Sequence, residues 1–219
     1  MVKVSMVLWL IGIVSALLLL LKLFVGGGYP GNIGSRRSDG SMSDTLELKN
    51  IVHDMEILRT KCSPVGNIDS RTLKNLDQML EIMYANGGIG LAANQVGLTD
   101  RIVVIDLYEN GVRRPMYLIN PEIIEKSEET KFGPEGCLSI PVSEKSDVRR
   151  SVRIKVKYLD RNGKEIILNA TGLLAICIQH EVDHLDGILY IDHLSKARRD
   201  FVVDRTKNNV RRLEKAKKN

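Results

Sequence analysis

Cysteine is scarce in this chain of 219 residues, and its three cysteines, Cys62, Cys137 and Cys177, do not lie close together. This spacing is not typical of a disulfide framework, so we expect a reduced, cytoplasmic catalytic domain. The small-residue segment at residues 88–95 lacks the lysine of a P-loop, and no G-x-G-x-x-G motif occurs. Both absences argue against phosphate and dinucleotide binding.

Histidine is scarce too, but two of the four histidines stand in the pattern His180-Glu181-Val182-Asp183-His184. Histidines four apart on a helix point the same way and can hold one metal ion, and the glutamate between them can exchange protons with a water beside that ion. Leu173, Ile176 and Cys177 fall on the same helical stripe, so we expect both histidines to face inward. The pattern predicts metal-assisted hydrolysis.

A third protein ligand must come from elsewhere if one position stays open for water. Cys177 lies one turn before His180 on the same face, so geometry alone leaves it open. Cys137 is better placed, because residues 133–139 form a Gly- and Pro-punctuated turn from which a side chain can project. We expect Cys62 to be a small buried hydrophobic residue.

The third informative segment is residues 88–95, in which small and apolar residues lead to Gln95. Small residues let a substrate backbone approach closely, and the Gln95 amide is a neutral donor suited to an oxyanion.

Three motifs, GIGLAANQ, EGCLS and HEVDHLDG, follow one another at intervals of about forty residues. In this order they resemble peptide deformylase, and the resemblance covers residues 46–213. It implies a hydrolase that removes the formyl group from the initiator methionine of nascent polypeptides and releases formate.

The resemblance makes Cys137, His180 and His184 the metal ligands. It implies one Fe(II) per chain, with Zn(II) or another divalent ion as a substitute, because a thiolate and two imidazoles suit either metal. Asp183 is expected to have a structural role, either as an acceptor behind the ligands or in an ion pair with an arginine such as Arg150.

The resemblance also implies the catalytic residues. Glu181 is the general acid and base, Gln95 and the backbone N–H of Leu138 stabilise the tetrahedral intermediate, and Gly90 lies beside the substrate backbone.

The substrate of such an enzyme is a formyl-Met peptide, whose methionine side chain needs an apolar pocket. Ile89, Ile176 and Cys177 are expected to line it. Further contacts to the extended chain would be mostly main chain, as in strand addition.

The expected fold class is α+β, with antiparallel β-sheets packed around a central metal-binding helix, a C-terminal helix and an N-terminal apolar helix. Apolar periodicity predicts a helix at residues 69–86. Strands are expected at residues 101–108 and 153–160, the second leading through an Asn-Gly turn into a partner at residues 166–170. The chain then divides into an apolar segment at 1–25, a flexible linker at 26–45, a catalytic domain at 46–195 and a basic helix at 196–219.

The N-terminus departs from the family. From residue 4 to residue 25 the chain is apolar with Lys22 as its one charge, long enough at about 1.5 Å per residue to cross a bilayer. A membrane anchor, a cleaved targeting segment and a start assigned too early, with Met42 as the true start, all remain open. An anchor would leave the catalytic domain in the cytoplasm, since Arg36 and Arg37 follow it.

The C-terminal segment carries most of the positive charge, with ten Lys and Arg against three Asp and Glu from Lys196 to Asn219. It is either a solvated helix or an arm that binds ribosomal RNA near emerging chains. It has no motif or aromatic interleaving for sequence-specific recognition, so DNA is not expected as a partner.

Two other classes of function remain. A membrane-associated metalloprotease would share the H-E-x-x-H motif, but it normally takes its third ligand from downstream of the helix. A non-catalytic metal-binding or ribosome-interaction protein would retain Glu181 and Gln95 without using them.

Overall fold

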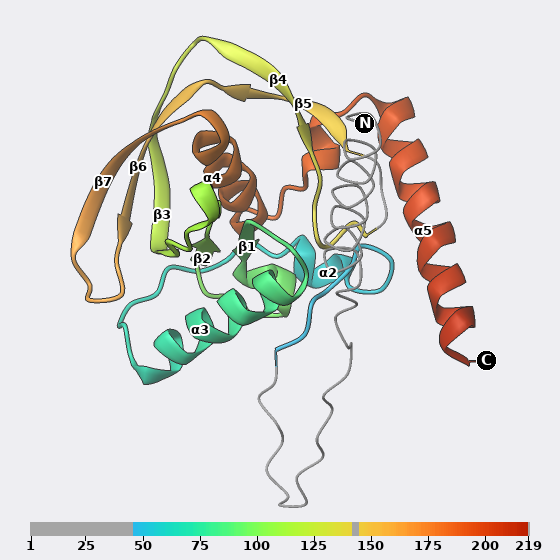
Figure 1. Ribbon diagram of the computed structural model, residues 1–219, viewed down its shortest axis with the longest axis horizontal. Coiled ribbons are helices and arrows are strands. Elements are labelled where there is room, and N and C mark those ends of the chain that lie inside the picture. Colours follow the sequence, from blue (N-terminus) through green and yellow to red (C-terminus); the bar gives the residue numbers. More distant parts are fainter. Residues whose placement is uncertain (1–45, 142–144, 219) are drawn as a thin grey trace, which may run out of the picture. The chain divides into compact units, whose positions relative to one another are not determined.

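Antiparallel strands dominate the computed structural model, which describes residues 46–141 and 145–218 and confirms the α+β class (Figure 1). Five strands form one sheet in the order β1-β2-β3-β6-β7, and two others pair as a separate hairpin. The strands of the sheet are β1 (Gly90–Ala92), β2 (Ile102–Ile105), β3 (Met116–Lys126), β6 (Arg153–Leu159) and β7 (Glu165–Thr171). The hairpin consists of β4 (Thr130–Glu135) and β5 (Ser146–Ser151).

The helices pack around these strands. They are α2 (Met55–Leu58), α3 (Ser70–Ala85), α4 (Gly172–Leu185) and α5 (Lys196–Lys218), with short 3-10 turns at η1 (Ala93–Val96), η2 (Glu109–Gly111) and η3 (Tyr190–His193). Helix α4 contacts every strand of the five-stranded sheet as well as β5, which confirms its predicted central position (Figure 1). Within the described residues no helix has the length and hydropathy that crossing a bilayer requires. The predicted apolar helix at residues 1–25 lies outside that part of the chain.

Helix α3 confirms the prediction for residues 69–86. The Asp69 side chain caps its first turn by accepting a hydrogen bond from the Thr72 backbone N–H at 2.8 Å. Leu76, Met79 and Met83 are fully buried on one face, which packs against β1 and β2.

The predicted hairpin at residues 153–170 is also confirmed, as β6 and β7. Gly163 has a φ of +77° in the turn, a conformation that glycine adopts without steric cost. Ile154 and Val156 alternate into the core as expected.

The strand predicted at residues 101–108 ends early, at Ile105. The Asp106 carboxylate accepts hydrogen bonds from the backbone N–H groups of Tyr108 and Arg114, at 3.0 and 3.2 Å. These bonds turn the chain away from the sheet, so local side-chain hydrogen bonding overrides the apolar pattern. The Asp106 N–H also donates to the Ile89 carbonyl at 2.9 Å and thereby anchors the segment before β1.

Helix α4 is buried on two sides. Ala175, Ile178, Val182 and Leu185 recur at helical spacing and join the main core. Cys177, His180, Glu181 and His184 lie on the other side of the helix and are buried as well. A helix that packs on both of these sides supplies a rigid support for a site.

Helix α5 confirms the expected C-terminal helix. Its Val202 packs into a second apolar cluster with Ile51 and Leu58, and Glu214 contacts His53 at 2.7 Å. The segment is therefore attached to the catalytic domain and is not a free tail.

Candidate metal centre and active site

The three predicted ligands come together. Ligand atoms of Cys137, His180 and His184 all lie within 4.8 Å of one another. Cys137 Sγ is 3.2 Å from His184 Nε2, and the two imidazole ring centres are 5.0 Å apart. The group has the donors of a thiolate and two imidazoles, which suits iron or zinc.

The other two cysteines, among the described residues, are not part of this group. Cys62 is buried in the main core, and burial raises the pKa of its thiol to about 11, so it remains a neutral apolar residue as expected. Cys177, the alternative third ligand, packs against the Ile89 carbonyl with its sulfur at 3.7 Å.

Local structure explains how Cys137 reaches the histidines. Strand β4 ends at Glu135, and a turn follows in which the Ile140 N–H donates to the Cys137 carbonyl at 3.0 Å. Helix α4 presents His180 and His184 on successive turns, so the cysteine from the hairpin completes a group that the helix begins.

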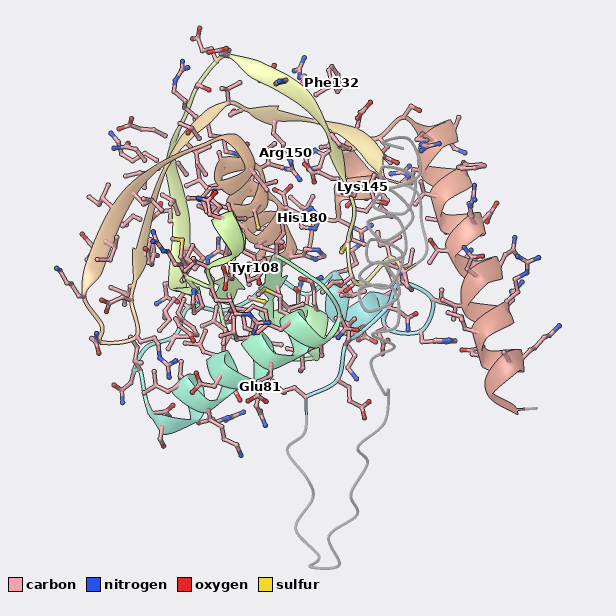
Figure 2. All side chains as sticks on the ribbon, viewed as in Figure 1. Glu81, Tyr108, Phe132, Lys145, Arg150 and His180 are labelled. Carbon is pink, nitrogen blue, oxygen red and sulfur yellow. The ribbon has the colours of Figure 1, made fainter. Side chains whose placement is uncertain are left out.

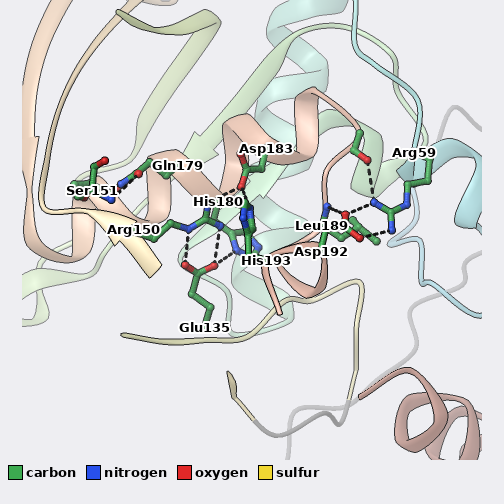
Figure 3. A network of polar contacts seen from close by, with 12 residues as sticks. Arg59, Glu135, Arg150, Ser151, Gln179, His180, Asp183, Leu189, Asp192 and His193 are labelled. Atoms are coloured by element: carbon green, nitrogen blue, oxygen red, sulfur yellow. Dashed lines mark hydrogen bonds and ion pairs between the residues drawn. The ribbon is translucent and has the colours of Figure 1, made fainter. Parts of the chain in front are cut away.

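A buried ionic network lies behind His180 (Figure 3). Glu135 Oε2 is 2.8 Å from His180 Nδ1, and the same carboxylate makes two contacts with Arg150, at 2.7 and 3.1 Å. Arg150 also pairs with Asp183, which in turn contacts His193 Nε2 at 2.7 Å. The predicted Arg150–Asp183 pair is therefore present, and it extends to Glu135.

Electrostatics favour a cation in this group. Burial alone would lower the pKa of His180, but contacts with the Cys137 sulfur and the Glu135 carboxylate outweigh it and raise that pKa well above its usual value. Surroundings that draw a proton onto this imidazole also attract a metal ion, so the residues fit the metal that the motif implies.

His184 is kept neutral. Its pKa is lowered well below the usual value, first by burial and then by the neighbouring His180. Neutral imidazole is the form that binds metals. Asn94 fixes this end of α4 by donating to the carbonyls of His184 and Leu58.

Glu181 is buried beside the ligands, with 4% of its surface exposed. Its Oε2 atom has no hydrogen-bond partner among the described residues, and burial raises the pKa of its carboxyl to about 7, with His180 opposing the shift. A carboxyl poised near neutral pH can both accept and return a proton. An added Cβ at Gly90 would overlap Glu181 Oε1 and lie 2.7 Å from Cys177 Sγ, so a side chain at this position would displace Glu181 or Cys177.

Gln95 is held in one orientation. Its Oε1 atom accepts a hydrogen bond from the Ala92 N–H at 2.8 Å, which directs the amide nitrogen toward Cys137 Sγ at 3.5 Å and Ser139 Oγ at 3.3 Å. The donor end of the amide therefore faces the ligand group, next to Leu138.

A cavity of about 350 Å³ opens beside these groups. The residues expected to surround a methionine side chain, Ile89, Ile176 and Cys177, all line it, together with Leu138 and Leu173. All the predicted site residues except His184 contribute to its wall. The structure thus brings the three predicted ligands together and places Glu181, Gln95, Leu138 and Gly90 at the same cavity.

Sequence reasoning assigned no role to Glu135, Asn94 or Lys145. Glu135 stands in the EGCLS motif two residues before Cys137, and Asn94 stands next to Gln95, so both had a signal in their motif positions. Lys145, which also lines the cavity, lies outside the three motifs.

Comparison with known proteins agrees with this site. The polypeptide deformylase family model matches residues 48–200. A peptide deformylase of Rhizobium meliloti (strain 1021) is 47% identical over 150 residues, which cover 68% of this chain and 86% of that protein.

Solved structures give the same result. The crystal structure of peptide deformylase from Ehrlichia chaffeensis is 38% identical, with a TM-score of 0.70 and coverage of 75% of this chain and 96% of that one. The same enzyme in complex with actinonin has a TM-score of 0.69 at 39% identity, covering 75% of this chain and 97% of that one. The matched segment contains all three motifs and the complete Cys/His/His group, and this chain belongs to the peptide deformylase family.

Proposed function

We propose that this chain removes the formyl group from the initiator methionine of nascent polypeptides and releases formate. The observation that carries the proposal is the position of Glu181, buried beside the Cys137, His180 and His184 group at an apolar cavity. Membership of the peptide deformylase family supports the same activity.

Cys137, His180 and His184 would hold one divalent cation. When bound, the ion supplies Lewis-acid chemistry, which makes water more acidic and polarises a carbonyl oxygen. We propose Fe(II) as the native ion and Zn(II) as a substitute. Metal analysis of protein purified without oxygen tests this choice, and zinc at one equivalent with no iron would contradict it.

The remaining chemistry belongs to side chains of the chain. Glu181 takes a proton from the water that attacks the formyl carbon and then delivers it to the leaving nitrogen. Gln95 Nε2 and the Leu138 backbone N–H donate hydrogen bonds to the oxygen on which charge develops. The formyl C–N bond breaks, and formate and a free amine result.

The cavity wall sets the substrate. An apolar pocket beside the ligands receives the methionine side chain, and Gly90 leaves room for the peptide backbone. Strand β1 stands at the end of the sheet order, and within the described residues one of its edges pairs with no other strand, so an extended peptide could pair there.

Two substrates distinguish this activity from that of a metalloprotease. The wild type should release formate from formyl-Met-Ala-Ser and should leave the internal bonds of an unformylated peptide intact. Cleavage of internal bonds without release of formate would favour the protease.

We propose further that α5 attaches the enzyme to the ribosome through its basic surface. Lys207, Arg211 and Arg212 are exposed on this helix. Because Val202 anchors α5 in the fold, charge reversal at the exposed positions is a cleaner test than truncation. Reversal should weaken ribosome binding, and the affinity should fall steeply with salt. Unchanged affinity would contradict the docking role.

The catalytic domain would work in the cytoplasm, and residues 4–25 would anchor it to a membrane. Full-length protein expressed from Met1 should sediment with membranes. Recovery in the supernatant after pelleting would contradict the anchor.

A further inference from the structure

Lys145 is the one lysine or arginine among the described residues that line the cavity. The two carboxylates in the same wall, Glu135 and Glu181, are buried. Glu135 contacts both Arg150 and His180. Lys145 is exposed, and its ammonium makes no ion pair with any residue in the described ranges. Among the described residues, Lys145 is therefore the accessible charge of this cavity wall, and the other charged side chains of the wall are buried.

The backbone of Lys145 is fixed. Arg198, in the first turn of α5, donates to the Lys145 carbonyl at 3.4 Å and to Ser146 Oγ at 3.2 Å. The Lys145 Cγ atom lies 3.7 Å from the position that a Cβ on Gly136 would occupy, so its stem runs along the turn that carries Cys137. Figure 2 shows Lys145 at the hairpin side of the site, near His180. The stem of Lys145 therefore lies beside the Cys137 turn, and its exposed side chain forms part of the cavity wall.

The substrate of the proposed function lacks the usual positive charge at its N-terminus, because formylation removes it. The first charged group that such a chain can bring to the mouth is the side chain of its second or third residue. An extended peptide advances about 3.3 Å per residue, so these side chains emerge where the methionine pocket ends. Gly87 and Gly88, which also line the cavity, carry no charge.

We propose that Lys145 determines substrate preference by favouring nascent chains with an acidic residue at position two or three. This inference rests on the proposed deformylase function and names the substrate class within it. A flexible ammonium in water acts as a point charge, so it selects by sign rather than by shape. Basic residues at the same positions are disfavoured by the same charge.

The test compares kcat/KM for three formylated peptides, formyl-Met-Asp-Ala, formyl-Met-Ala-Ala and formyl-Met-Lys-Ala, measured as formate release. The wild type should prefer the Asp peptide over the Lys peptide by about three- to tenfold, as expected for an exposed charge pair. Lys145→Ala should bring the ratio close to one, and Lys145→Glu should invert it. Raising the salt to about 0.5 M should reduce the wild-type ratio, because exposed charges are screened.

Lys131→Glu is the matched control. Lys131 is exposed on β4 in the same hairpin and is not among the residues that line the cavity. Its replacement by Glu changes the net charge by the same amount as Lys145→Glu. It should keep the wild-type ratio. A ratio that Lys145→Glu leaves unchanged, or that Lys131→Glu changes equally, overturns the proposal.

The two proposals fail in different ways. Hydrolysis of the Ala peptide with equal rates on the Asp and Lys peptides overturns the role of Lys145 alone. No formate from any of the three peptides overturns the proposed function together with this inference.

Discussion

Glu135 Oε2 lies 2.8 Å from His180 Nδ1, on the side of the imidazole ring away from the nitrogen that remains for a metal. A carboxylate in this position fixes the ring orientation and increases the basicity of the free nitrogen. The metal-binding group therefore depends on a residue that would not touch the metal.

Replacing Glu135 by Gln should weaken metal binding by about 10- to 100-fold, because the charge behind His180 is lost while the shape is kept. Competition with a chromogenic chelator measures this affinity directly. Glu129→Gln serves as the control, since Glu129 is exposed and pairs with Arg153 near the surface. Equal metal affinity in wild type and Glu135→Gln would show that the contact does not support the ligand.

Arg150→Met should destabilise the metal-free protein by about 3 kcal/mol, because two carboxylates lose the charge that compensates their burial. Arg150 is 6% exposed and contacts both Glu135 and Asp183. Arg149→Met on the same strand removes an exposed arginine and should change the free energy of unfolding by less than about 0.5 kcal/mol. Urea denaturation provides both values, and similar losses for the two variants would contradict the account of the network.

Acid should destabilise the metal-free fold through the same network. Burial would raise the pKa values of Glu135 and Asp183, but contacts with His180 and Arg150 for the first, and with His193 and Arg150 for the second, lower both. A carboxyl with a lowered pKa binds protons more weakly in the folded state. Its stabilising effect is complete above the unfolded pKa of about 4 and is lost as the pH falls through the folded value.

The free energy of unfolding, measured from about pH 6 to pH 2, should therefore decline below about pH 4, and less steeply in Asp183→Asn. Asp147→Asn removes an exposed carboxylate outside the network and should keep the wild-type slope. Identical slopes in wild type and Asp183→Asn would be inconsistent with the network.

Gly90→Ala should reduce kcat/KM by about 100-fold or more, since the new methyl group displaces the Glu181 carboxylate. Overpacking should also cost about 1–3 kcal/mol of stability. Gly66→Ala is the matched control, because an added Cβ there has no atom within 4 Å. Full activity of Gly90→Ala would contradict this prediction, because it would show that the added methyl group does not disturb the Glu181 carboxylate.

Much of the site could be predicted because its signals are local. The spacing of His180 and His184 depends only on helix geometry, and the apolar stripe on α4 shows which way they face. Helix α3 and the β6–β7 hairpin were predicted for the same reason, since caps, periodicity and turn residues lie within each segment.

The remainder depends on contacts between distant segments. Glu135 meets His180 across 45 residues, and although Glu135 stands in the EGCLS motif, that motif does not show which residue its carboxylate contacts. Strand β2 ends at Ile105 because Asp106 reaches the Tyr108 and Arg114 backbone, which an apolar pattern does not reveal. Lys145 has no motif, and its place in the cavity wall follows only from the folded chain.

The most direct test of the account is Glu181→Gln, with formate release from a formyl-Met peptide and metal content measured on the same sample. Gln keeps the shape of the buried side chain but cannot accept and return the proton. The account predicts one bound metal per chain, as in wild type, and a kcat lowered by about 100-fold or more. Wild-type kcat with full metal content would contradict the role of Glu181 as proton carrier.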